Sequence, residues 1–444
     1  MPFIEEDAAA LHFAAGHAPR WQRARRFQFL LPLLPLLLQL PPASGVTAQT
    51  SRHPYYIDTV IVHRRNVFGS RSGWLGSAAN SLHIVTHENV IRQELLFQTG
   101  DPPDPDLLDE TERNLRALGI IGDVAVIADT IPGRGHRVHV HVYSRDRWTL
   151  GLKPTYKQEG GVRDMRLMLN DDNILGSGQS FTVGYNYRSD RDNPNGVELD
   201  WVNRRLFGTR LGMNLQARNS EDDALGSLDL ERPFFSEETP WAGGVSLAKE
   251  RQRIRVYQDG VLTLTEHRES EMETLWGALS SGVNTKYRFG GAYIRSRAER
   301  GSLPSSALDQ LDLLTMGVAL SERRFYRGQF IENFGRVEDV PLGYLVSLIG
   351  GPNIRFSPAS KSGAYVRLDG QYALGGNRQW YLNLGLTASS FFDGREVRDA
   401  LLQPEIVGFW RASTLTTLVW HFLYSRGLNW ATGRQFLLGS PTGL

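Results

Sequence analysis

The sequence predicts a mainly β protein, with a small N-terminal α/β domain followed by an antiparallel transmembrane β-barrel. The clearest observation is the strict alternation of apolar and polar residues over 180–188. A period of two is typical of a β-strand with one apolar face and one polar face. Just before it, 171–173 and 176–178 supply the Asp, Asn and Gly residues that turns require, so we expect a β-hairpin. The apolar face of its second strand is formed by Phe181, Val183, Tyr185 and Tyr187.

The same alternation recurs after about residue 147, in segments that include 197–202, 211–218, 364–372 and 380–389. Long strands that are apolar on one side and polar or charged on the other are typical of transmembrane barrels. A soluble β-sandwich is the alternative, but its strands would be shorter and would carry fewer charges opposite the apolar face. At roughly 20–25 residues per strand and connection, residues 147–444 predict about 12–14 strands.

The composition excludes several other classes of protein. The net charge is +1 and the mean hydropathy is −0.32, which favours neither a nucleic-acid-binding protein nor a helical membrane protein. The chain has no cysteine, so disulfides, thiolate metal sites and a cysteine nucleophile are excluded. Its 45 glycines and its aromatic content of 10% suit curved sheets with interfacial aromatic residues.

Residues 1–48 predict a secretory signal peptide preceded by an N-terminal extension. Arginines between Arg20 and Arg26 come before an apolar run over 27–40, and residues 44–48 offer a cleavage site with small side chains. A membrane anchor is the alternative. A run of about 14 residues with two prolines is too short to span a core of ~30 Å, so we expect the protein to be exported.

Residues 55–146 predict a compact domain in which a strand, two helices and two further strands form a small sheet covered on one face. We expect a loop over 69–85, where Gly and Ser are frequent, and Thr86 as the N-cap of the first helix. The predicted elements are a strand over 56–67, helices over 88–97 and 106–118, and strands over 123–128 and 137–143.

The stretch from His87 to Val126 resembles a POTRA domain, the periplasmic module of the BamA/TamA outer-membrane insertase superfamily. The similar features are the helix ending at Phe97, the Gly100-Asp101 pair, the second helix ending in 115–119, and the strand that follows. The turn formed by Asn173, Leu175, Gly176 and Gly178 resembles the N-L-x-G-x-G turn near the start of that family's barrel.

The resemblance covers residues 55–444 and implies a POTRA domain over 55–146 and a barrel over 147–444. Only one POTRA domain fits before the barrel, whereas BamA-like, TamA-like and two-partner secretion members carry more. The branch of the superfamily therefore stays open.

The end of the chain resembles the opening of the family's lumenal sixth loop, with Leu438, Gly439 and Gly443 at its start. The family's barrel is similar to a sixteen-stranded cylinder, and the arginine that follows in the family's loop signature is not reached. We therefore expect a fragment that lacks the loop tip and about four strands. Such a barrel would have two unpaired edges and would be unstable in a membrane by itself.

The first barrel strand, expected over 148–157, contains the candidate seam residues Trp148, Leu150, Leu152 and Pro154. Proline cannot donate a ladder hydrogen bond, so the contact between this strand and the last strand would be weak. The resemblance implies that such a seam opens sideways and templates a client hairpin. The exposed edge of the POTRA sheet could also accept a client strand.

No residue pattern argues for catalysis, a cofactor or a metal. His139 and His141 share one strand face and could hold a metal, but we expect a solvated strand face without a metal. Arginines on polar strand faces are expected to line the lumen and to pair with acids there. These arginines are Arg188, Arg218, Arg288 and Arg367, and the acids are Glu198, Asp200, Asp229 and Asp369.

The expected function is assembly or insertion of outer-membrane proteins by strand templating without nucleotide. The expected partners are unfolded outer-membrane protein clients and outer-membrane lipid, to which periplasmic accessory proteins or chaperones could be added, and no nucleic acid. The alternative is a two-partner-type secretion pore or a passive outer-membrane channel. The protein is expected in the bacterial outer membrane, with its POTRA domain in the periplasm.

Overall fold

The computed structural model describes the chain from Tyr55 to Trp430 with short gaps. The described residues divide into two compact units between Arg147 and Trp148, called here the N-terminal module and the C-terminal sheet. The predicted signal peptide over 1–48 and the predicted loop start at Leu438, Gly439 and Gly443 lie outside the described residues. The described ranges are 55–69, 72–131, 135–159, 161–258, 261–299, 310–322, 324–329, 337–354, 362–376, 379–413 and 416–430.

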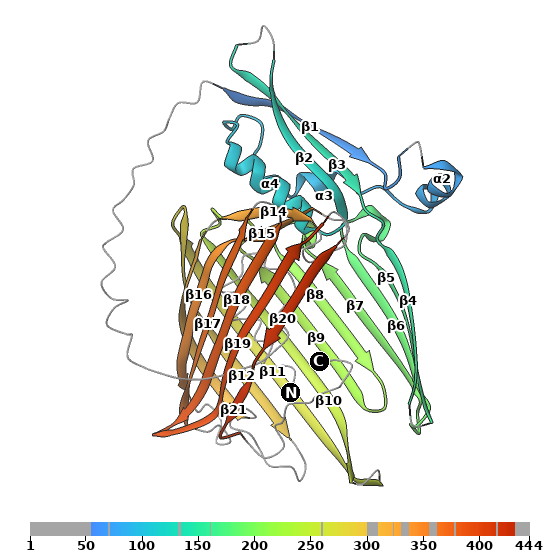
Figure 1. The fold of residues 1–444 in the computed structure, drawn as a ribbon, viewed down its shortest axis with the longest axis vertical. Coiled ribbons are helices and arrows are strands. Elements are labelled where there is room, and N and C mark those ends of the chain that lie inside the picture. Colours follow the sequence, from blue (N-terminus) through green and yellow to red (C-terminus); the bar gives the residue numbers. More distant parts are fainter. Residues whose placement is uncertain are drawn as a thin grey trace. The chain divides into compact units, whose positions relative to one another are not determined.

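The N-terminal module is a three-stranded sheet with helices (Figure 1). The strand order is β1-β3-β2, with β1 parallel and β2 antiparallel to β3. The strands are β1 (Tyr56–Arg65), β2 (Ile121–Thr130) and β3 (Arg137–Asp146), and the helices are α2 (Gly73–Leu82), α3 (Glu88–Arg92) and α4 (Pro105–Ala117).

The core of this module is aliphatic. Helix α4 starts where the Asp104 carboxylate accepts a hydrogen bond from the Asp106 backbone N–H (2.8 Å), with Pro105 in the first turn. Alternate residues of β3 point into the same core, as the period of two requires. The residues with no exposed surface in this core are Ile57, Ile91, Leu115, Ile120, Ile121, Val140 and Val142.

Three local predictions for this module are wrong, two of them at the start and end of helix α3. The helix predicted over 88–97 ends at Arg92, because the chain then turns so that the Leu96 N–H donates to Thr111 Oγ1 on α4 (3.2 Å). Thr86 is not its N-cap, since the Thr86 N–H donates to the Asp146 carboxylate (2.6 Å) and His87 holds the cap position.

The segment 69–85, predicted as a loop, contains helix α2. Its glycine and serine content concealed an apolar stripe at helical spacing, which is the signal that identifies it. The residues of this stripe are Leu75, Ala78, Ala79 and Leu82.

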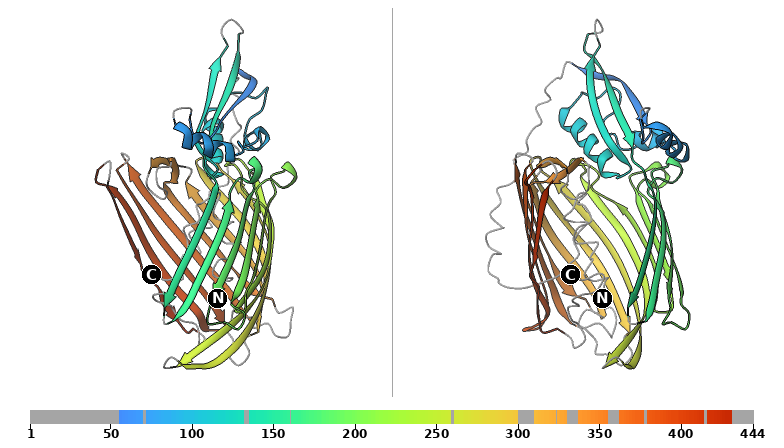
Figure 2. Two further views of the ribbon diagram at one scale, coloured as in Figure 1. Left: turned by 90° about the vertical axis from the view of Figure 1, so that its right-hand side faces the viewer. Right: turned by 45° about the vertical axis from the view of Figure 1, so that its right-hand side comes forward.

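The C-terminal sheet has sixteen strands, and neighbours on the path from β4 to β20 are antiparallel. Figure 2 shows that these strands follow a curved wall. The first ten strands are β4 (Leu150–Glu159), β5 (Val162–Asp171), β6 (Ser180–Arg188), β7 (Asn195–Asn203), β8 (Gly212–Asn219), β9 (Asp223–Arg232), β10 (Trp241–Gln258), β11 (Val261–Ser281), β12 (Thr285–Glu299) and β13 (Gln310–Glu322). The last six are β16 (Gly343–Asn353), β17 (Gly363–Gly376), β18 (Trp380–Asp393), β19 (Glu396–Arg411), β20 (Thr417–Leu423) and β21 (Arg426–Leu428).

A separate hairpin of β14 (Phe325–Gln329) and β15 (Val337–Pro341) lies between β13 and β16 in the chain, and β21 pairs with β19 beyond the end of β20. Two short 3-10 helices, Ile174–Gly176 and Leu206–Gly208, form the turns that follow β5 and β7. No helix within the described ranges is long and apolar enough to cross a membrane.

The predicted fold class is confirmed: the chain is mainly β, with an α/β module followed by a large antiparallel sheet. Strand β6 has the bounds that alternation predicts. The predicted number of strands, about 12–14, is too low. The strands from β4 to β9 are only eight to ten residues long and have short connections, so each uses less chain than the assumed 20–25 residues.

Candidate functional site

The two faces of the C-terminal sheet differ in polarity. On one face, large apolar side chains recur at alternate positions of many strands and stay about half exposed, whereas most of the residues between them are polar, small or buried. Exposed apolar area is unfavourable in water, and a patch of this extent marks a surface that meets another apolar phase. Representative members are Met165, Leu167 and Leu169 on β5, Val183 and Tyr185 on β6, Leu314, Met316 and Val318 on β13, and Leu384 and Leu386 on β18. We call this surface the apolar band.

Aromatic residues bound the apolar band at one end of the sheet. The proximal rim is defined here as the end at which β4 begins, and strand directions alternate from there. Exposed aromatic residues gather at strand ends on this rim, and Trp380 lies opposite Trp410 in the β18–β19 register. Their rings favour the interface between water and acyl chains. These residues are Trp241, Tyr287, Tyr372, Trp380 and Trp410.

Charges bound the band at the opposite end, the distal rim, on β10, β11 and β12. On the face that carries Val245 and Leu247, the next outward residue is Lys249, whose Nζ lies 2.7 Å from Glu271 and 2.6 Å from Glu269. On β12, Arg295 lies 3.4 Å from Glu273. Exposed ion pairs of this kind belong in water, so the band ends before them.

The other face of the sheet carries ion pairs. Arg367 lies 2.7 Å from Asp369, as predicted, but Glu198 pairs with Arg166 (2.6 Å), a residue that the sequence did not single out. Gly184 explains this pairing. Gly184 belongs to β6, the strand between Arg166 on β5 and Glu198 on β7, and it lies opposite Glu198. A Cβ at this position would come within 2.3 Å of Glu198 Cγ. The missing side chain lets Arg166 reach across a whole strand.

The other predicted pairings are partly wrong. Arg218 pairs with Asp223 and lies 3.7 Å from Glu250, and Arg288 has its guanidinium 4.6 Å from the centre of the Phe234 ring. The Asp229 carboxylate accepts a hydrogen bond from the Ser246 hydroxyl. The alternation identified the face, but partner choice depends on strand register and on glycine positions, which alternation does not encode.

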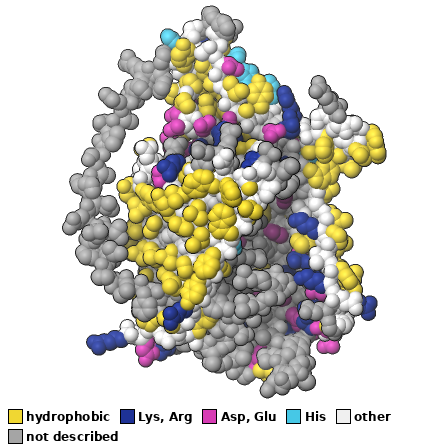
Figure 3. Space-filling model, in the orientation of Figure 1, with side chains coloured by type: hydrophobic (Ala, Val, Ile, Leu, Met, Phe, Trp, Pro, Cys, Tyr) yellow, Lys and Arg dark blue, Asp and Glu magenta, His cyan; other side chains and the backbone are white. Residues whose placement is uncertain are grey.

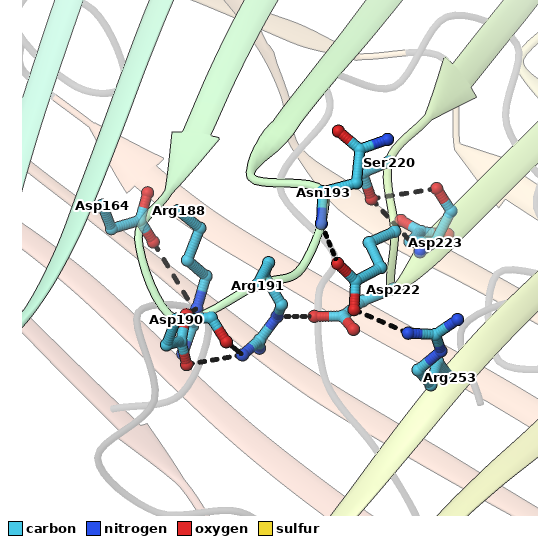
Figure 4. Close-up of polar contacts among 10 residues, drawn as sticks. Asp164, Arg188, Asp190, Arg191, Asn193, Ser220, Asp222, Asp223 and Arg253 are labelled. Carbon is cyan, nitrogen blue, oxygen red and sulfur yellow. Dashed lines mark hydrogen bonds and ion pairs between the residues drawn. The ribbon is translucent and has the colours of Figure 1, made fainter.

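A network of charges at the distal rim connects residues of four neighbouring hairpins, β4–β5, β6–β7, β8–β9 and β10–β11 (Figure 4). Arg188 contacts Asp164 and Asp190, Arg191 contacts Asp190 and Asp222, and Arg253 lies 2.6 Å from Glu221. Burial alone would raise the pKa of Asp190. The hydrogen bond from Arg188 and the charges of Arg188 and Arg191 outweigh it and hold that pKa below its ordinary value. The network ties the connections β6–β7 and β8–β9 to β10.

The predicted turn residues Asn173, Leu175, Gly176 and Gly178 lie together in one turn on the proximal rim. The Asn173 side-chain oxygen accepts a hydrogen bond from the Gly178 N–H (2.7 Å), and the Gly176 N–H donates to the Asn173 carbonyl (2.9 Å). Leu175, Gly176 and Gly178 all have positive φ, at 51°, 71° and 72°. A leucine in this conformation is strained, and it is held by the hydrogen bonds on either side.

The next turn on the proximal rim repeats this geometry, which the sequence reading missed. Phe207 and Gly208 have φ of 53° and 72°, and the Gly208 and Thr209 N–H groups donate to the carbonyls of the residues three before them. The signal is a short repeat, in which Ile174-Leu175-Gly176-Ser177 corresponds to Leu206-Phe207-Gly208-Thr209. Both strained apolar side chains project outward, and Phe207 is 92% exposed.

The candidate seam strand is β4. Trp148 precedes it, and Leu150 and Leu152 are exposed on it. In the part of the chain that the structure describes, β4 pairs only with β5, and β20 pairs only with β19. The sheet therefore has two open edges. The Asp172 N–H donates to the Thr149 carbonyl, which places the backbone groups of Thr149 and every second residue after it towards β5. Pro154 has the opposite parity, so its nitrogen faces the open side of β4.

The edges of the module's sheet are partly occupied. The Glu112 carboxylate accepts a hydrogen bond from the Val126 N–H of β2 (2.8 Å) and one from Arg116 (3.1 Å). On β1, both backbone groups of Ile57 bond to the 100–101 segment, and Arg92 donates to the Val60 carbonyl (3.2 Å). Any further strand that paired along β2 would have to displace Glu112.

The histidines of the module lie on the open face of its sheet. His141 Nδ1 is 3.0 Å from His63 Nε2, and His139 lies 3.7 Å from Asp58. Among the residues whose placement is described, no group of three or more His, Asp or Glu side chains is arranged to hold a metal ion.

Asp146 is the buried acid at the end of β3. Its carboxylate accepts the Thr86 N–H and lies 3.7 Å from His83 Nε2. Burial raises the pKa of Asp146, and the bonds from Thr86 only partly oppose this effect.

The solved structures that are similar to this chain include BamA and CdiB proteins. BamA from Haemophilus ducreyi lacking POTRA domains 1–3 has 11% identity and a TM-score of 0.32, over 84% of this chain and 81% of that one. CdiB from Acinetobacter baumannii has 9% identity and a TM-score of 0.35, over 85% and 71%. CdiB from Escherichia coli has 11% identity and a TM-score of 0.37, over 85% and 73%. No protein-family model and no curated protein matches the chain.

Proposed function

We propose that this chain is an outer-membrane assembly factor of the BamA/TamA type, which inserts other β-barrel proteins by pairing their strands with the open side of β4. The observation that carries the proposal is the position of Pro154. A strand that pairs with the open side of β4 receives no N–H donor from position 154, in the middle of the strand. The seam therefore lacks one ladder hydrogen bond, which favours exchange of one partner strand for another.

The apolar band supports placing the sheet in a membrane. Within hydrocarbon, an unpaired backbone group costs several kcal/mol, so a free strand edge has a strong tendency to capture a partner. A client hairpin that pairs with this edge satisfies the unpaired backbone groups of β4. Each ladder hydrogen bond also satisfies a backbone group of the client that was unpaired before. Nucleotide hydrolysis is not needed, because pairing itself lowers the free energy.

The N-terminal module acts in this proposal as a POTRA domain in the periplasm. Its sheet order and its two helices α3 and α4 support this role. Because Glu112 occupies the Val126 N–H, we assign the first client contact to the part of β2 beyond Val126 or to β1, and strand templating itself to β4. The partners are unfolded outer-membrane proteins and lipid, and periplasmic chaperones could deliver the clients.

Depletion of the protein from its host tests this function. We expect the amounts of other outer-membrane barrels to fall, and unchanged amounts would reject the proposal. Complementation with Pro154→Val should restore these barrels less well than the natural chain, because a complete ladder closes the seam. Pro404→Val is the matched control, since Pro404 lies on β19 and its carbonyl accepts the Tyr424 N–H, so its nitrogen faces the β20 side and not the open side of β4.

A secretion pore or passive channel is the second candidate, and the charged inner face favours it. Ion pairs such as Arg166–Glu198 and Arg367–Asp369 suit a water-filled interior. Planar bilayer recordings separate the two functions: a large steady conductance, together with normal barrel assembly after depletion, would favour the pore.

A further inference from the structure

Helix α2 presents an apolar stripe to its surroundings. Leu75, Ala78, Ala79 and Leu82 follow the helical spacing, and Trp74 adjoins them one turn before Ala78. Trp74 is 77% exposed, Leu75 64% and Leu82 76%. Figure 3 shows hydrophobic atoms gathered over α2, at the right of the view. Scattered apolar residues are common on surfaces, but a contiguous stripe headed by tryptophan is not.

The opposite side of α2 is tied to the module. The Phe68 N–H donates to Asn80 Oδ1 (3.1 Å), Asn80 Nδ2 donates to the Phe68 carbonyl (2.8 Å), and Asn66 donates to the Asn80 carbonyl (3.4 Å). These bonds hold the side of α2 that carries Asn80 against the segment 66–68, so the apolar stripe faces away from that segment.

Helix α2 also carries few polar groups that would be costly to transfer into an apolar phase. No residue of α2 is charged. The Ser77 and Ser81 hydroxyls donate to the carbonyls of Gly73 (3.1 Å) and Ala78 (2.7 Å) within the helix. Satisfied hydroxyls and the absence of charge remove most of the cost of desolvation.

Charge and chain connectivity indicate the occupant. The exposed Arg65 lies one residue before the tethering segment that begins at Asn66, which suits anionic headgroups beside the stripe. Only Arg147, Trp148 and Thr149 separate β3 of the module from β4 of the sheet. This link spans no more than about 14 Å, so the module stays next to the membrane that holds the sheet.

We propose that α2 is a membrane-surface anchor, which inserts Trp74, Leu75 and Leu82 into the interface of the anionic phospholipid leaflet next to the module. A short helix with a tryptophan-bearing apolar face lies in the plane of the interface, with its apolar side buried by about 5–10 Å. The anchor rests on the proposed membrane location of the sheet. It fixes the module against the bilayer.

Fluorescence quenching in the full chain tests the anchor. The natural sequence has no cysteine, so a single cysteine carrying an environment-sensitive dye can be placed at Leu75, Ser77, Thr130 or Val183. The chain is reconstituted into phosphatidylethanolamine–phosphatidylglycerol vesicles that contain lipids with a quencher near the headgroup. We expect the Leu75 label to be quenched several-fold more than the Ser77 label, which lies outside the apolar stripe, and the exposed Thr130 label on β2.

The Val183 label reports whether the sheet itself has entered the bilayer, so the two proposals can fail separately. Quenching at Val183 with none at Leu75 would overturn the anchor alone, as would protection of Leu75 from a soluble quencher without lipid quenching, which marks a protein partner or a second copy. With both Trp74→Asp and Leu82→Asp, quenching at Leu75 should fall to the Thr130 level while Val183 is unchanged. Both substituted residues are exposed, so the module keeps its core.

Discussion

The N-terminal module and the C-terminal sheet are built from the same alternating strands but place their apolar residues oppositely. In the module, Val140 and Val142 of β3 point into a closed core. In the sheet, Leu167 and Val183 point outward and stay about half exposed, whereas ion pairs occupy the other face. The same period of two is therefore compatible with a closed core and with an apolar exterior. The face that carries the charged residues distinguishes the two arrangements.

The edges differ in the same way. Side chains and a neighbouring segment occupy parts of the module's edges, at Val126 and Ile57. The outer edge of β4 carries a proline instead, which weakens pairing without blocking it. Occupied edges hinder pairing with further strands, whereas the proposed templating role requires that the edge of β4 stays available.

The largest expected difference between the two regions comes from shortening an aliphatic side chain. Leu115→Ala leaves a cavity in the module core and should cost about 2–5 kcal/mol. Leu167→Ala, on the apolar band, should change unfolding in detergent by less than about 1 kcal/mol. Hydrogen exchange of the β3 and β5 amides in the full chain measures both, and equal losses at the two sites would contradict the assignment of the faces.

The next effect comes from adding a charge to neighbouring residues of β6. Val183→Arg places the charge on the apolar band and should destabilise the membrane-inserted sheet by about 2–4 kcal/mol. Thr182→Arg puts it on the inner face, opposite Asp200, where it should be tolerated. Folding yields into vesicles decide the matter, and the reverse order of yields would exclude lipid contact on the Val183 side.

The contribution of Asp146 to the free energy of unfolding of the module should decrease as the pH rises. Its raised pKa means that the folded state holds the proton more tightly, so its contribution to stability is largest below the ordinary aspartate pKa. That contribution is lost as the pH rises through the raised value, at about 1.4 kcal/mol per pKa unit. The unfolding free energy of the natural chain minus that of Asp146→Asn should therefore fall as the pH rises above the ordinary aspartate pKa. A difference that rises would refute the burial effect.

The smallest effect is expected from Gly184→Ala. A methyl group there collides with Glu198 and separates it from Arg166, which should cost on the order of 1 kcal/mol. Gly226→Ala, also on the C-terminal sheet, has open space at its Cβ position and serves as the control. If both variants unfold at the same denaturant concentration, the ion pair contributes nothing measurable.

Much of the fold follows from the sequence because period and turn chemistry are local properties. The bounds of β6, the turn at Asn173 to Gly178, and helix α4 with its prolines and arginine-rich end are all of this kind. Helix α3 was predicted too long because the Leu96 N–H finds a partner on α4, which no local pattern reveals.

The interior ion pairs and the occupied edges could not be predicted for a related reason. The Arg166–Glu198 pair crosses the intervening strand at a glycine, and Glu112 bonds to a strand that follows it by 14 residues. Both depend on three-dimensional register. Helix α2, by contrast, was visible in the spacing of Leu75, Ala78, Ala79 and Leu82, but its glycines and serines outweighed that signal.

The most direct test of the central claim is a scan of spin labels along β5, from Asp164 to Asn170, in the reconstituted chain. The account predicts that accessibility to oxygen, which concentrates in acyl chains, peaks at Met165, Leu167 and Leu169, while a polar nickel chelate reaches the residues between them. Accessibility without this period of two, or with the opposite phase, would contradict a lipid-facing apolar band.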